Sequence, residues 1–244
     1  MNEWYKDWFS SDEYLNLYSH RDDEDAEKLL ELILTETNPV KNALVLDAAC
    51  GAGRHSINLA SRGYHVVGFD LSKSLLRRAK QDAYKKNVDV SLFCGDLRKI
   101  SLNKKFDLIL NLFTSFGYFP GDEENFSFVR TAYHLLNEKC FYLLDFLNSS
   151  YLLNHLIPET VKEFENKKII ERRRIQGNRV VKQIIIQNGI TESSYLESVR
   201  LYSKEKIVSE FEQIGFNLVK EFGDYDGSIF NAEKSQRLIL FFRK

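Results

Sequence analysis

A chain of 244 residues is long enough for one large domain or two small ones with a sizeable hydrophobic core. Its 43% hydrophobic and 28% charged residues, with only 3 prolines, exclude a mainly disordered or low-complexity protein. The 34 lysines and arginines nearly cancel the 35 aspartates and glutamates, so the net charge of -1 offers no overall field to a nucleic acid or an anionic membrane.

The cysteines and the amino terminus bear on the cellular compartment. Cys50, Cys94 and Cys140 are far apart and lie in apolar stretches, which fits reduced, buried thiols better than disulfides or a zinc site. No targeting sequence is visible at the amino terminus, and no apolar run reaches the length of about 18 residues that a membrane span requires. We expect a cytoplasmic protein without a membrane segment and, because the histidines are scattered, without a metal site.

An amphipathic helix is predicted at 24–37, where leucines and isoleucines recur at helical spacing behind an acidic first turn, and Pro39 ends the pattern. Short, almost continuous apolar runs follow, separated by helix-like stretches. The runs lie at 43–47, 64–70, 90–96, 106–113 and 140–146, and the helix-like stretches at 54–62, 72–86 and 122–137. Because strands buried on both faces alternate with helices, we expect a parallel sheet built from βα units.

Residues 161–202 interrupt this alternation with three β-rich runs, joined by Gly/Asn hairpin signals at 177–178 and 188–189. These runs predict a three-stranded antiparallel meander. The alternation then resumes with a helix at 203–214, for which Ser203 is the expected N-cap, and with strands at 216–222 and 237–242.

The predicted fold class is therefore α/β, a doubly wound and mostly parallel sheet with an inserted antiparallel subdomain. The first 22 residues carry six aromatic side chains outside the alternating pattern and are expected to form a lid. The expected division is a main domain at 1–148 and 203–244, which includes the lid at 1–22, and an inserted subdomain at 149–202.

The segment VLDAACGAGRHSINLA at 44–59 joins a strand that ends at Asp47 to an amphipathic helix through a tight loop with Gly51 and Gly53. Glycines in such a loop let the backbone come close to a ligand. A dinucleotide-binding loop would place a third glycine or alanine three residues after Gly53, where this chain has Ser56. No Gly-Lys-Ser/Thr follows either, which excludes a P-loop.

Acidic side chains end the next two predicted strands. Asp70 can accept hydrogen bonds from both hydroxyls of a ribose, and Asp96 can accept one from an exocyclic amine. Leu71 and Leu97, which follow these acids, could sandwich a flat ring. Each acid alone could equally be a helix cap or a turn residue, but their common position at strand ends favours a nucleoside pocket.

With these motifs the chain resembles the class I S-adenosylmethionine-dependent methyltransferases. The resemblance rests on DAACGAG at 47–53, on Asp70, on GDL at 95–97 and on NLFTSFGYF at 111–119. It implies a Rossmann-like, seven-stranded sheet whose last strand is antiparallel. It also implies that the glycine loop contacts the methionyl part of S-adenosylmethionine, Asp70 the ribose and Asp96 the adenine amine. The expected cofactor-binding set is Tyr18, Arg21, Asp47, Ala49, Gly51, Gly53, Asp70, Leu71, Asp96, Leu97, Asn111 and Phe113.

A narrower resemblance concerns the methyl acceptor. The aromatic lead segment that ends in YSHRD, the SFGYF after the fourth strand, the insertion and GDYDGS near the end are similar to the small-molecule subgroup, which includes sugar-amine N-methyltransferases and glycine N-methyltransferase. The function we expect is in-line transfer of a methyl group to a nitrogen or oxygen of a small molecule, with the insertion covering the acceptor. Phe116 and Tyr118 are the expected acceptor-binding residues, although aromatic side chains here could also be ordinary core.

No catalytic residue is assigned, because an amine acceptor needs only to arrive unprotonated, whereas a hydroxyl acceptor would need a base. Tyr18 and Arg21 could close over the cofactor, with Arg21 pairing its carboxylate, or Arg21 could simply neutralise the acidic residues that follow it. An RNA methyltransferase and a non-catalytic cofactor-binding protein are the alternatives. The basic run KKIIERRR supports RNA, but its position on a predicted strand favours a solvated sheet face, so no nucleic-acid partner is expected and a homodimer stays open.

Overall fold

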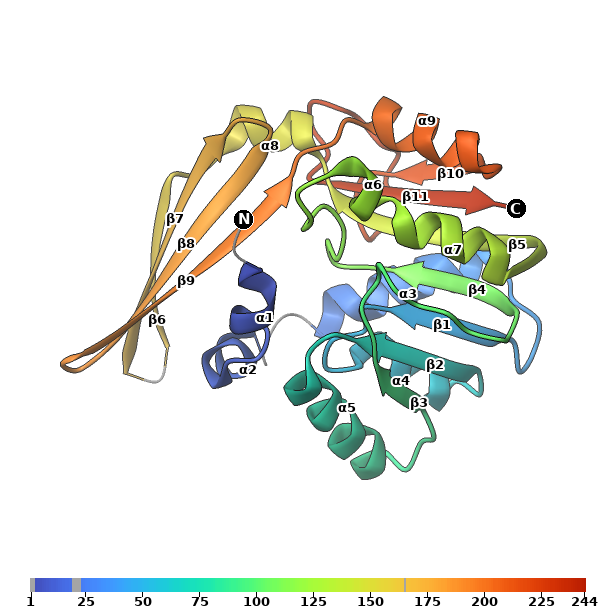
Figure 1. Cartoon of the computed structure of the whole chain (residues 1–244), viewed down its shortest axis with the longest axis horizontal. Helices are drawn as coiled ribbons and strands as arrows, with labels where there is room; N and C mark the ends of the chain where they lie inside the picture. Colours follow the sequence, from blue (N-terminus) through green and yellow to red (C-terminus); the bar gives the residue numbers. More distant parts are fainter. Residues whose placement is uncertain (1–2, 19–22, 165) are drawn as a thin grey trace.

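The computed structural model describes residues 3–18, 23–164 and 166–244. Figure 1 shows a sheet flanked by helices and, beside it, a long and curved second sheet. The helices are α1 (Trp4–Trp8), α2 (Asp12–Tyr18), α3 (Asp23–Thr37), α4 (Arg54–Ser61), α5 (Lys73–Lys85), α6 (Asp122–Asn125), α7 (Ser127–Leu135), α8 (Ser149–His155) and α9 (Lys204–Ile214). The strands of the first sheet are β1 (Leu44–Ala48), β2 (His65–Asp70), β3 (Ser91–Cys94), β4 (Phe106–Asn111), β5 (Leu136–Leu147), β10 (Asn217–Phe222) and β11 (Arg237–Arg243).

The first sheet has the order β10-β11-β5-β4-β1-β2-β3. β1 lies parallel to β2 and β4, β4 is parallel to β5, and β2 is parallel to β3. β11 is antiparallel to both β5 and β10. This arrangement confirms the predicted fold class, a doubly wound and mostly parallel sheet of seven strands, and it brings the carboxyl ends of β1 to β5 to one edge.

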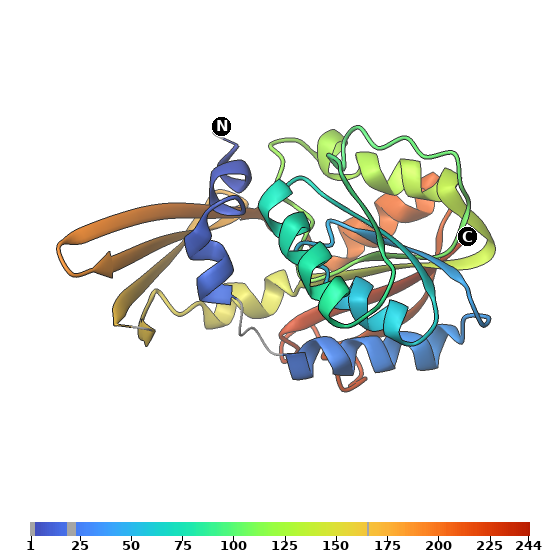
Figure 2. The ribbon, with the colours of Figure 1, turned by 90° about the horizontal axis from the view of Figure 1, so that it is seen from below.

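Alternate side chains of the strands enter two different cores, which explains their almost continuous apolar sequences. In β1, Leu46 packs in the core that includes Phe128 of α7 and Phe211 of α9, whereas Val45 packs with Leu30 of α3. Figure 2 shows α3 and α7 on opposite sides of the sheet. Ser203 caps α9 as expected, since its hydroxyl accepts a hydrogen bond from the amide of Lys206 at 3.2 Å.

The second sheet has four antiparallel strands, so the predicted three-stranded meander was wrong by one strand. Its strands are β6 (Glu159–Phe164), β7 (Lys167–Gln176), β8 (Arg179–Asn188) and β9 (Thr191–Arg200). The first β-rich run, which begins at 161, forms two strands rather than one. These strands, β6 and β7, pair in register from Glu159 with Arg172 to Phe164 with Lys167. The chain reverses there with Asn166 in the left-handed region, at φ 63°, a conformation that asparagine tolerates without the glycine that marks the other two turns.

The helical stretch expected at 122–137 also differs. It forms two helices, α6 and α7, and ends at Leu135, because β5 begins at Leu136 and is longer than the predicted strand.

Helices α1 and α2 lie between the two sheets, as both ribbon views show. Trp8 is fully buried there, and its indole Nε1 donates a hydrogen bond of 2.7 Å to Glu197 of β9. Trp4 and Tyr5 share an apolar cluster with Ile169 and Ile184 of the second sheet. The same cluster is packed by Leu71 and Leu97, which follow β2 and β3, so the amino-terminal segment contacts both sheets' surroundings: the second sheet and the loops of the first. Of the helices described, none has the length and hydropathy needed to cross a membrane.

Candidate functional site

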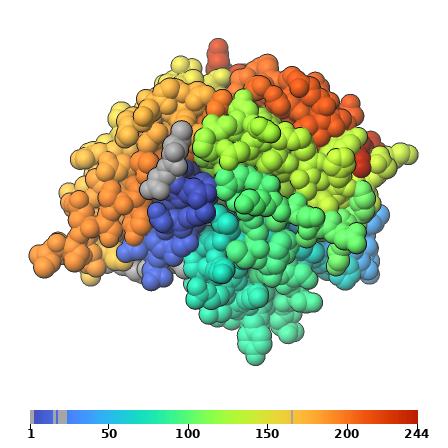
Figure 3. Space-filling model, in the orientation of Figure 1, coloured from blue at the N-terminus to red at the C-terminus, as the bar shows by residue number. Residues whose placement is uncertain are grey.

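A cavity of about 790 Å³ opens at the carboxyl edge of the parallel strands. We call the loops after β1, β2, β3 and β4 its floor, and residues 5–14 together with 118–119 its wall. Figure 3 shows the amino-terminal segment, in blue, lying across this face between the second sheet, in orange, and α5, in teal. The predicted site residues that line the cavity are Asp47, Ala49, Gly51, Asp70, Leu71, Asp96, Leu97, Phe113 and Tyr118.

The glycine loop bends tightly over the end of β2. The amide of Cys50 donates to the carbonyl of Phe69 at 2.9 Å, and Gly51, at φ 55°, presents its amide to Asp70. Gly53 does not line the cavity. Its φ is 75° and a Cβ atom there would lie 2.8 Å from Cβ of Ala79, so this glycine allows α4 to pack closely on α5.

Asp70 is held by the backbone of two loops. Its Oδ2 accepts from the amide of Gly51 at 2.9 Å, and its Oδ1 accepts from the amide of Ser72 at 2.8 Å. Burial raises the pKa of Asp70 above its ordinary value, although these amides oppose the shift. The amide of Leu71 also acts on this carboxylate, but a carboxylate can accept about four hydrogen bonds, so it keeps acceptor capacity for the hydroxyls of a diol.

Asp47 lies deeper, with 2% of its surface exposed. The hydroxyl of Ser56 donates to its Oδ2 at 2.5 Å. Burial, and to a smaller extent the charge of Asp70, raises the pKa of Asp47 to about 7. Ser56 is the residue that departs from the dinucleotide-binding pattern, and the structure shows that it satisfies a buried carboxyl group.

Asp96 lies in the segment after β3 and forms a two-point ion pair with Arg98. Its Oδ1 accepts from Nε of Arg98 at 3.0 Å and its Oδ2 accepts from Nη2 at 2.7 Å. Burial raises the pKa of Asp96, but the hydrogen bonds and charge of Arg98 outweigh it, so this pKa is lower than usual. The sequence reasoning missed Arg98, although its position two residues after Asp96 was a usable signal.

The end of β4 is held by a buried carboxylate that the sequence reasoning also missed. Phe113 and Thr114 both have positive φ, at 54° and 63°. The amide of Phe113 donates to Oδ2 of Asp145 at 2.9 Å, and Arg237 donates to Oδ1 at 2.6 Å. Tyr225, from the GDYDGS motif, donates to Asp145 at 3.3 Å and stacks on the ring of Phe113. These contacts from β5 and β11 fix a strained turn in the floor.

The two expected acceptor-binding residues lie in different places, one in the cavity and one in the core. Tyr118 lines the cavity, where its ring lies 5.0 Å from that of Trp4 and is stacked with that of Tyr5. Phe116 instead lies in the core, against Phe126 and Tyr202.

Besides Gly53, three of the expected cofactor-binding residues do not line the cavity or lie outside the described structure. Asn111 is buried beside the floor, and its amide donates to the carbonyl of Ala48 at 3.3 Å. Tyr18 is the last residue of α2, but its side chain lies outside the described structure, as does the whole of Arg21.

His55 lines the cavity on the first turn of α4, and its ring lies 5.1 Å from that of Phe113. Burial, and then the neighbouring charge of Arg54, lowers the pKa of His55 to about 3. Burial also raises the pKa of the Cys50 thiol. His55 is therefore neutral near pH 7 and Cys50 is a thiol, so neither supplies a charge to the site. Within residues 3–18, 23–164 and 166–244, no three His, Cys, Asp or Glu side chains are grouped to hold a metal ion.

Basic side chains line the outer part of the cavity, along α5 and its neighbours. They are Lys6, Arg54, Lys73, Arg77, Arg78, Lys85 and Lys86. Asp82 also lines this part and pairs with Arg78 at 2.5 Å and with Lys85 at 3.2 Å. Lys73 and Arg77 form no ion pair with any residue that the structure describes. The cavity is thus acidic at the strand ends and basic toward its mouth.

Comparison with known proteins adds a family to this geometry. Residues 45–139 match the family described as a methyltransferase domain. A dTDP-3-amino-3,6-dideoxy-alpha-D-glucopyranose N,N-dimethyltransferase of Streptomyces fradiae is 35% identical over 104 residues, 42% of this chain and 39% of that protein. A glycine/sarcosine N-methyltransferase of Aphanothece halophytica is 30% identical over 112 residues, 45% of this chain and 42% of that protein. In both relatives, the match spans less than half of the protein.

Solved structures share the fold over nearly the whole chain. The CcbJ methyltransferase of Streptomyces caelestis covers 100% of this chain and 99% of its own, with a TM-score of 0.83 and 17% identity. An S-adenosylmethionine-dependent methyltransferase of Clostridium acetobutylicum covers 95% of both chains, with a TM-score of 0.82 and 18% identity. The whole architecture, including the second sheet, therefore has precedent among methyltransferases.

Proposed function

We propose that this chain, whose residues 45–139 match the methyltransferase-domain family, is an S-adenosylmethionine-dependent enzyme that methylates an amine of a small molecule. The observation that carries the proposal is that Asp70 and Asp96, from the ends of neighbouring strands, line one cavity with the glycine loop. Such a constellation fits a nucleoside whose sugar and base are bound by two carboxylates.

The residues of the floor fit this cofactor. Asp70 has acceptor capacity for the ribose hydroxyls, and Asp96 can accept from the adenine amine. Leu71 and Leu97 line the same cavity and supply apolar surface for the ring. The loop at 49–51 approaches the methionyl part, for which its left-handed residues keep the backbone close. When bound, S-adenosylmethionine supplies a methyl group activated by a positive sulfonium.

Positioning explains the catalysis better than a catalytic base does. Tyr5, Phe9, Tyr118 and Phe119 line the wall and keep water from the reacting atoms, and their π-faces favour a cation. Methyl transfer is an in-line displacement, so holding a neutral amine about 3 Å from the methyl group supplies much of the rate enhancement. With a pKa of about 3, His55 is too weak a base to deprotonate an ammonium group near pH 7.

The acceptor we propose is an amino sugar that carries a phosphate or diphosphate. Two sugar N,N-dimethyltransferases of Streptomyces act on dTDP-linked amino sugars according to their names, and they align with 41–42% of this chain. The basic lining of the cavity mouth, with Lys73 and Arg77, suits such an anionic group. We propose further that the inserted subdomain at 149–202 and the lid at 1–22 cover the acceptor, that the enzyme is cytoplasmic, alone or as a homodimer, and that nucleic acid is not a substrate.

Turnover tests this proposal directly. The protein is incubated with S-adenosylmethionine and a panel of dTDP-linked and free amino sugars, with glycine and with RNA, and formation of S-adenosylhomocysteine is measured. We expect turnover with a nucleotide-linked amino sugar. If RNA were the one acceptor methylated, or if none of these acceptors were, the result would contradict an amino sugar as the acceptor.

A variant pair tests the basic mouth separately. Replacing Lys73 and Arg77 together by alanine should raise KM for the nucleotide-linked sugar about threefold to tenfold, because two exposed charge interactions are lost, and should leave kcat unchanged. Lys80→Ala is the matched control, since Lys80 is exposed on the same helix but does not line the cavity. An equal effect of both variants would argue against a phosphate site at the mouth.

A further inference from the structure

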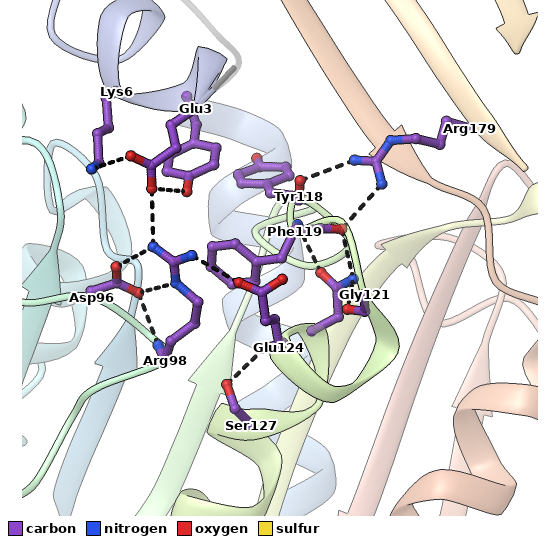
Figure 4. Close-up of polar contacts among 12 residues, drawn as sticks. Glu3, Lys6, Asp96, Arg98, Tyr118, Phe119, Gly121, Glu124, Ser127 and Arg179 are labelled. Carbon is purple, nitrogen blue, oxygen red and sulfur yellow. Dashed lines mark hydrogen bonds and ion pairs between the residues drawn. The ribbon is translucent and has the colours of Figure 1, made fainter. Parts of the chain in front are cut away.

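Arg98 joins three segments that are far apart in the sequence, as Figure 4 shows. Besides its two-point contact with Asp96, its Nη1 donates to Glu124 of α6 at 3.0 Å and its Nη2 donates to Glu3 at 3.2 Å. The guanidinium carbon lies 4.4 Å from the centroid of the Phe119 ring. One planar cation therefore contacts the segment after β3, the amino-terminal segment, and residues 119–124, which follow β4.

The contact with Asp96 fixes the direction of its carboxylate. Oδ1 accepts from the backbone amide and from Nε of Arg98, at 2.9 and 3.0 Å, so its two acceptor positions are filled. Oδ2 accepts only from Nη2 among the described groups, which leaves it one position for a ligand. The side chains of Asp96 and Arg98 are 16% and 20% exposed, so water competes weakly for this pair.

The contact with Glu3 joins the same guanidinium to the wall. Glu3 also accepts from the hydroxyl of Tyr5 at 2.8 Å and from Lys6 at 2.5 Å, and hydrogen bonds from Lys6, Tyr5 and Arg98 lower its pKa to about 2. Tyr5 and Lys6 both line the cavity. The carboxylate of Glu3 is therefore ionised at neutral pH and holds two wall residues next to Arg98.

The loop after β4 is fixed independently, from its other side. Arg179 of β8 donates to the carbonyls of Gly117, Tyr118 and Phe119 at 3.0 to 3.1 Å. Arg98 contacts Phe119 of this loop and Glu124 of the adjoining helix α6. Because Arg179 holds the loop and Trp8 holds the amino-terminal segment on β9, the contribution of Arg98 is the link between Glu3 of that segment and Asp96.

We propose that Arg98 is a positioning residue that couples the orientation of Asp96 to closure of the amino-terminal segment over the cavity. Nη2 donates to both Glu3 and Asp96, so the two contacts share one nitrogen atom and each constrains the geometry of the other. Binding of a cofactor amine at Asp96 then stabilises the closed segment, and by thermodynamic reciprocity the closed segment raises cofactor affinity. This inference rests on the proposed function, because it takes Asp96 as a cofactor ligand.

The experiment measures S-adenosylhomocysteine affinity by calorimetry and amide hydrogen exchange of residues 3–9 with and without that ligand. In the wild type, the ligand should slow exchange in this segment. Glu3→Gln should weaken ligand binding about threefold although Glu3 does not line the cavity. It should also abolish most of the slowing of exchange that the ligand causes in residues 3–9. Arg98→Lys, which keeps the charge but not the two-point geometry, should weaken binding about tenfold.

Glu13→Gln is the matched control, because Glu13 lies on the same segment but bonds to Tyr195 of β9, at 3.1 Å, and not to Arg98. It should bind within about twofold of the wild type. Wild-type affinity and protection in Glu3→Gln would overturn the coupling while leaving the proposed function intact. Absence of binding to the folded wild type would overturn both. A purely structural role of Arg98 would lower the melting temperature of Arg98→Lys without changing its affinity, and would also overturn the coupling.

Discussion

The floor and the wall of the cavity are built in different ways. In the floor, the glycine loop and the segment after β3 bond within the same or the next βα unit, such as Gly51 with Asp70 and Asp96 with Arg98. The turn after β4 is held by Asp145, a residue of the sheet itself. In the wall, contacts join distant parts of the chain, such as Trp8 with Glu197. The floor is thus part of the folded sheet, whereas the wall is a separate layer held by a few specific contacts. We therefore expect substitutions in the floor to cost global stability and those in the wall to change closure over the cavity.

The largest effect is expected at Asp145 of β5, which holds the turn after β4 in the floor. Asp145→Ala leaves the guanidinium of Arg237 without its buried partner, so the free energy of unfolding should fall by about 3–5 kcal/mol, as measured by urea denaturation. Asp226→Ala serves as the control, because Asp226 is exposed and accepts hydrogen bonds from Ser228 in its own turn. If the two variants lost equal stability, the tip of β4 would not be held as described.

The next effect depends on pH. The pKa of Asp47 is raised by burial to about 7 in the folded protein, so between pH 4 and 7 the folded state binds a proton that the unfolded state has released. This group therefore lowers stability as pH rises through that range. Asp47→Asn removes the titration and keeps the acceptor for Ser56. The free energy of unfolding of Asp47→Asn, minus that of the wild type, should rise by up to about 1.4 kcal/mol per pH unit from pH 4 to 7. Above pH 7 this difference should stay constant.

Urea denaturation of both proteins at several pH values measures this difference. A stability difference that is independent of pH would mean that Asp47 is ionised in the folded protein throughout, against the burial described for the floor.

The smallest effect on global stability is expected in the wall. Trp8→Ala removes a fully buried indole that packs on Tyr195, with ring centroids 4.5 Å apart. Amides of residues 3–18 should exchange at least about tenfold faster, while those of β1 and β4 keep their protection. Trp8→Phe keeps an aromatic ring at this position and removes the bond to Glu197, so its effect should be smaller. Equal acceleration in the sheet would show that the wall and the floor unfold as one unit.

The same contrast explains how much of the site the sequence could predict. Asp70 and Asp96 follow consecutive apolar runs, and the carboxyl ends of neighbouring parallel strands meet at one edge, so their common cavity was predictable. Gly51 likewise takes its left-handed conformation in the expected loop. Asp145 and Arg237 were not predictable, because they meet only through the antiparallel placement of β11 beside β5, which no local pattern encodes.

The missed strand has a similar cause. The reversal between β6 and β7 contains Asn166 but no glycine or proline. Because no turn was expected there, the two strands were predicted as one. The contacts of Glu3 and Trp8 could not be predicted either, since they depend on how the amino-terminal segment docks on residues about 95 and 189 positions away.

The most direct test of the central claim is calorimetric titration of the wild type and of Asp70→Ala with S-adenosylhomocysteine. We predict that the wild type binds the ligand and that Asp70→Ala binds at least tenfold more weakly, because two hydrogen bonds to a charged group are lost. Folded wild-type protein that gives no binding heat, or a variant of unchanged affinity, would contradict a ribose held at the end of β2.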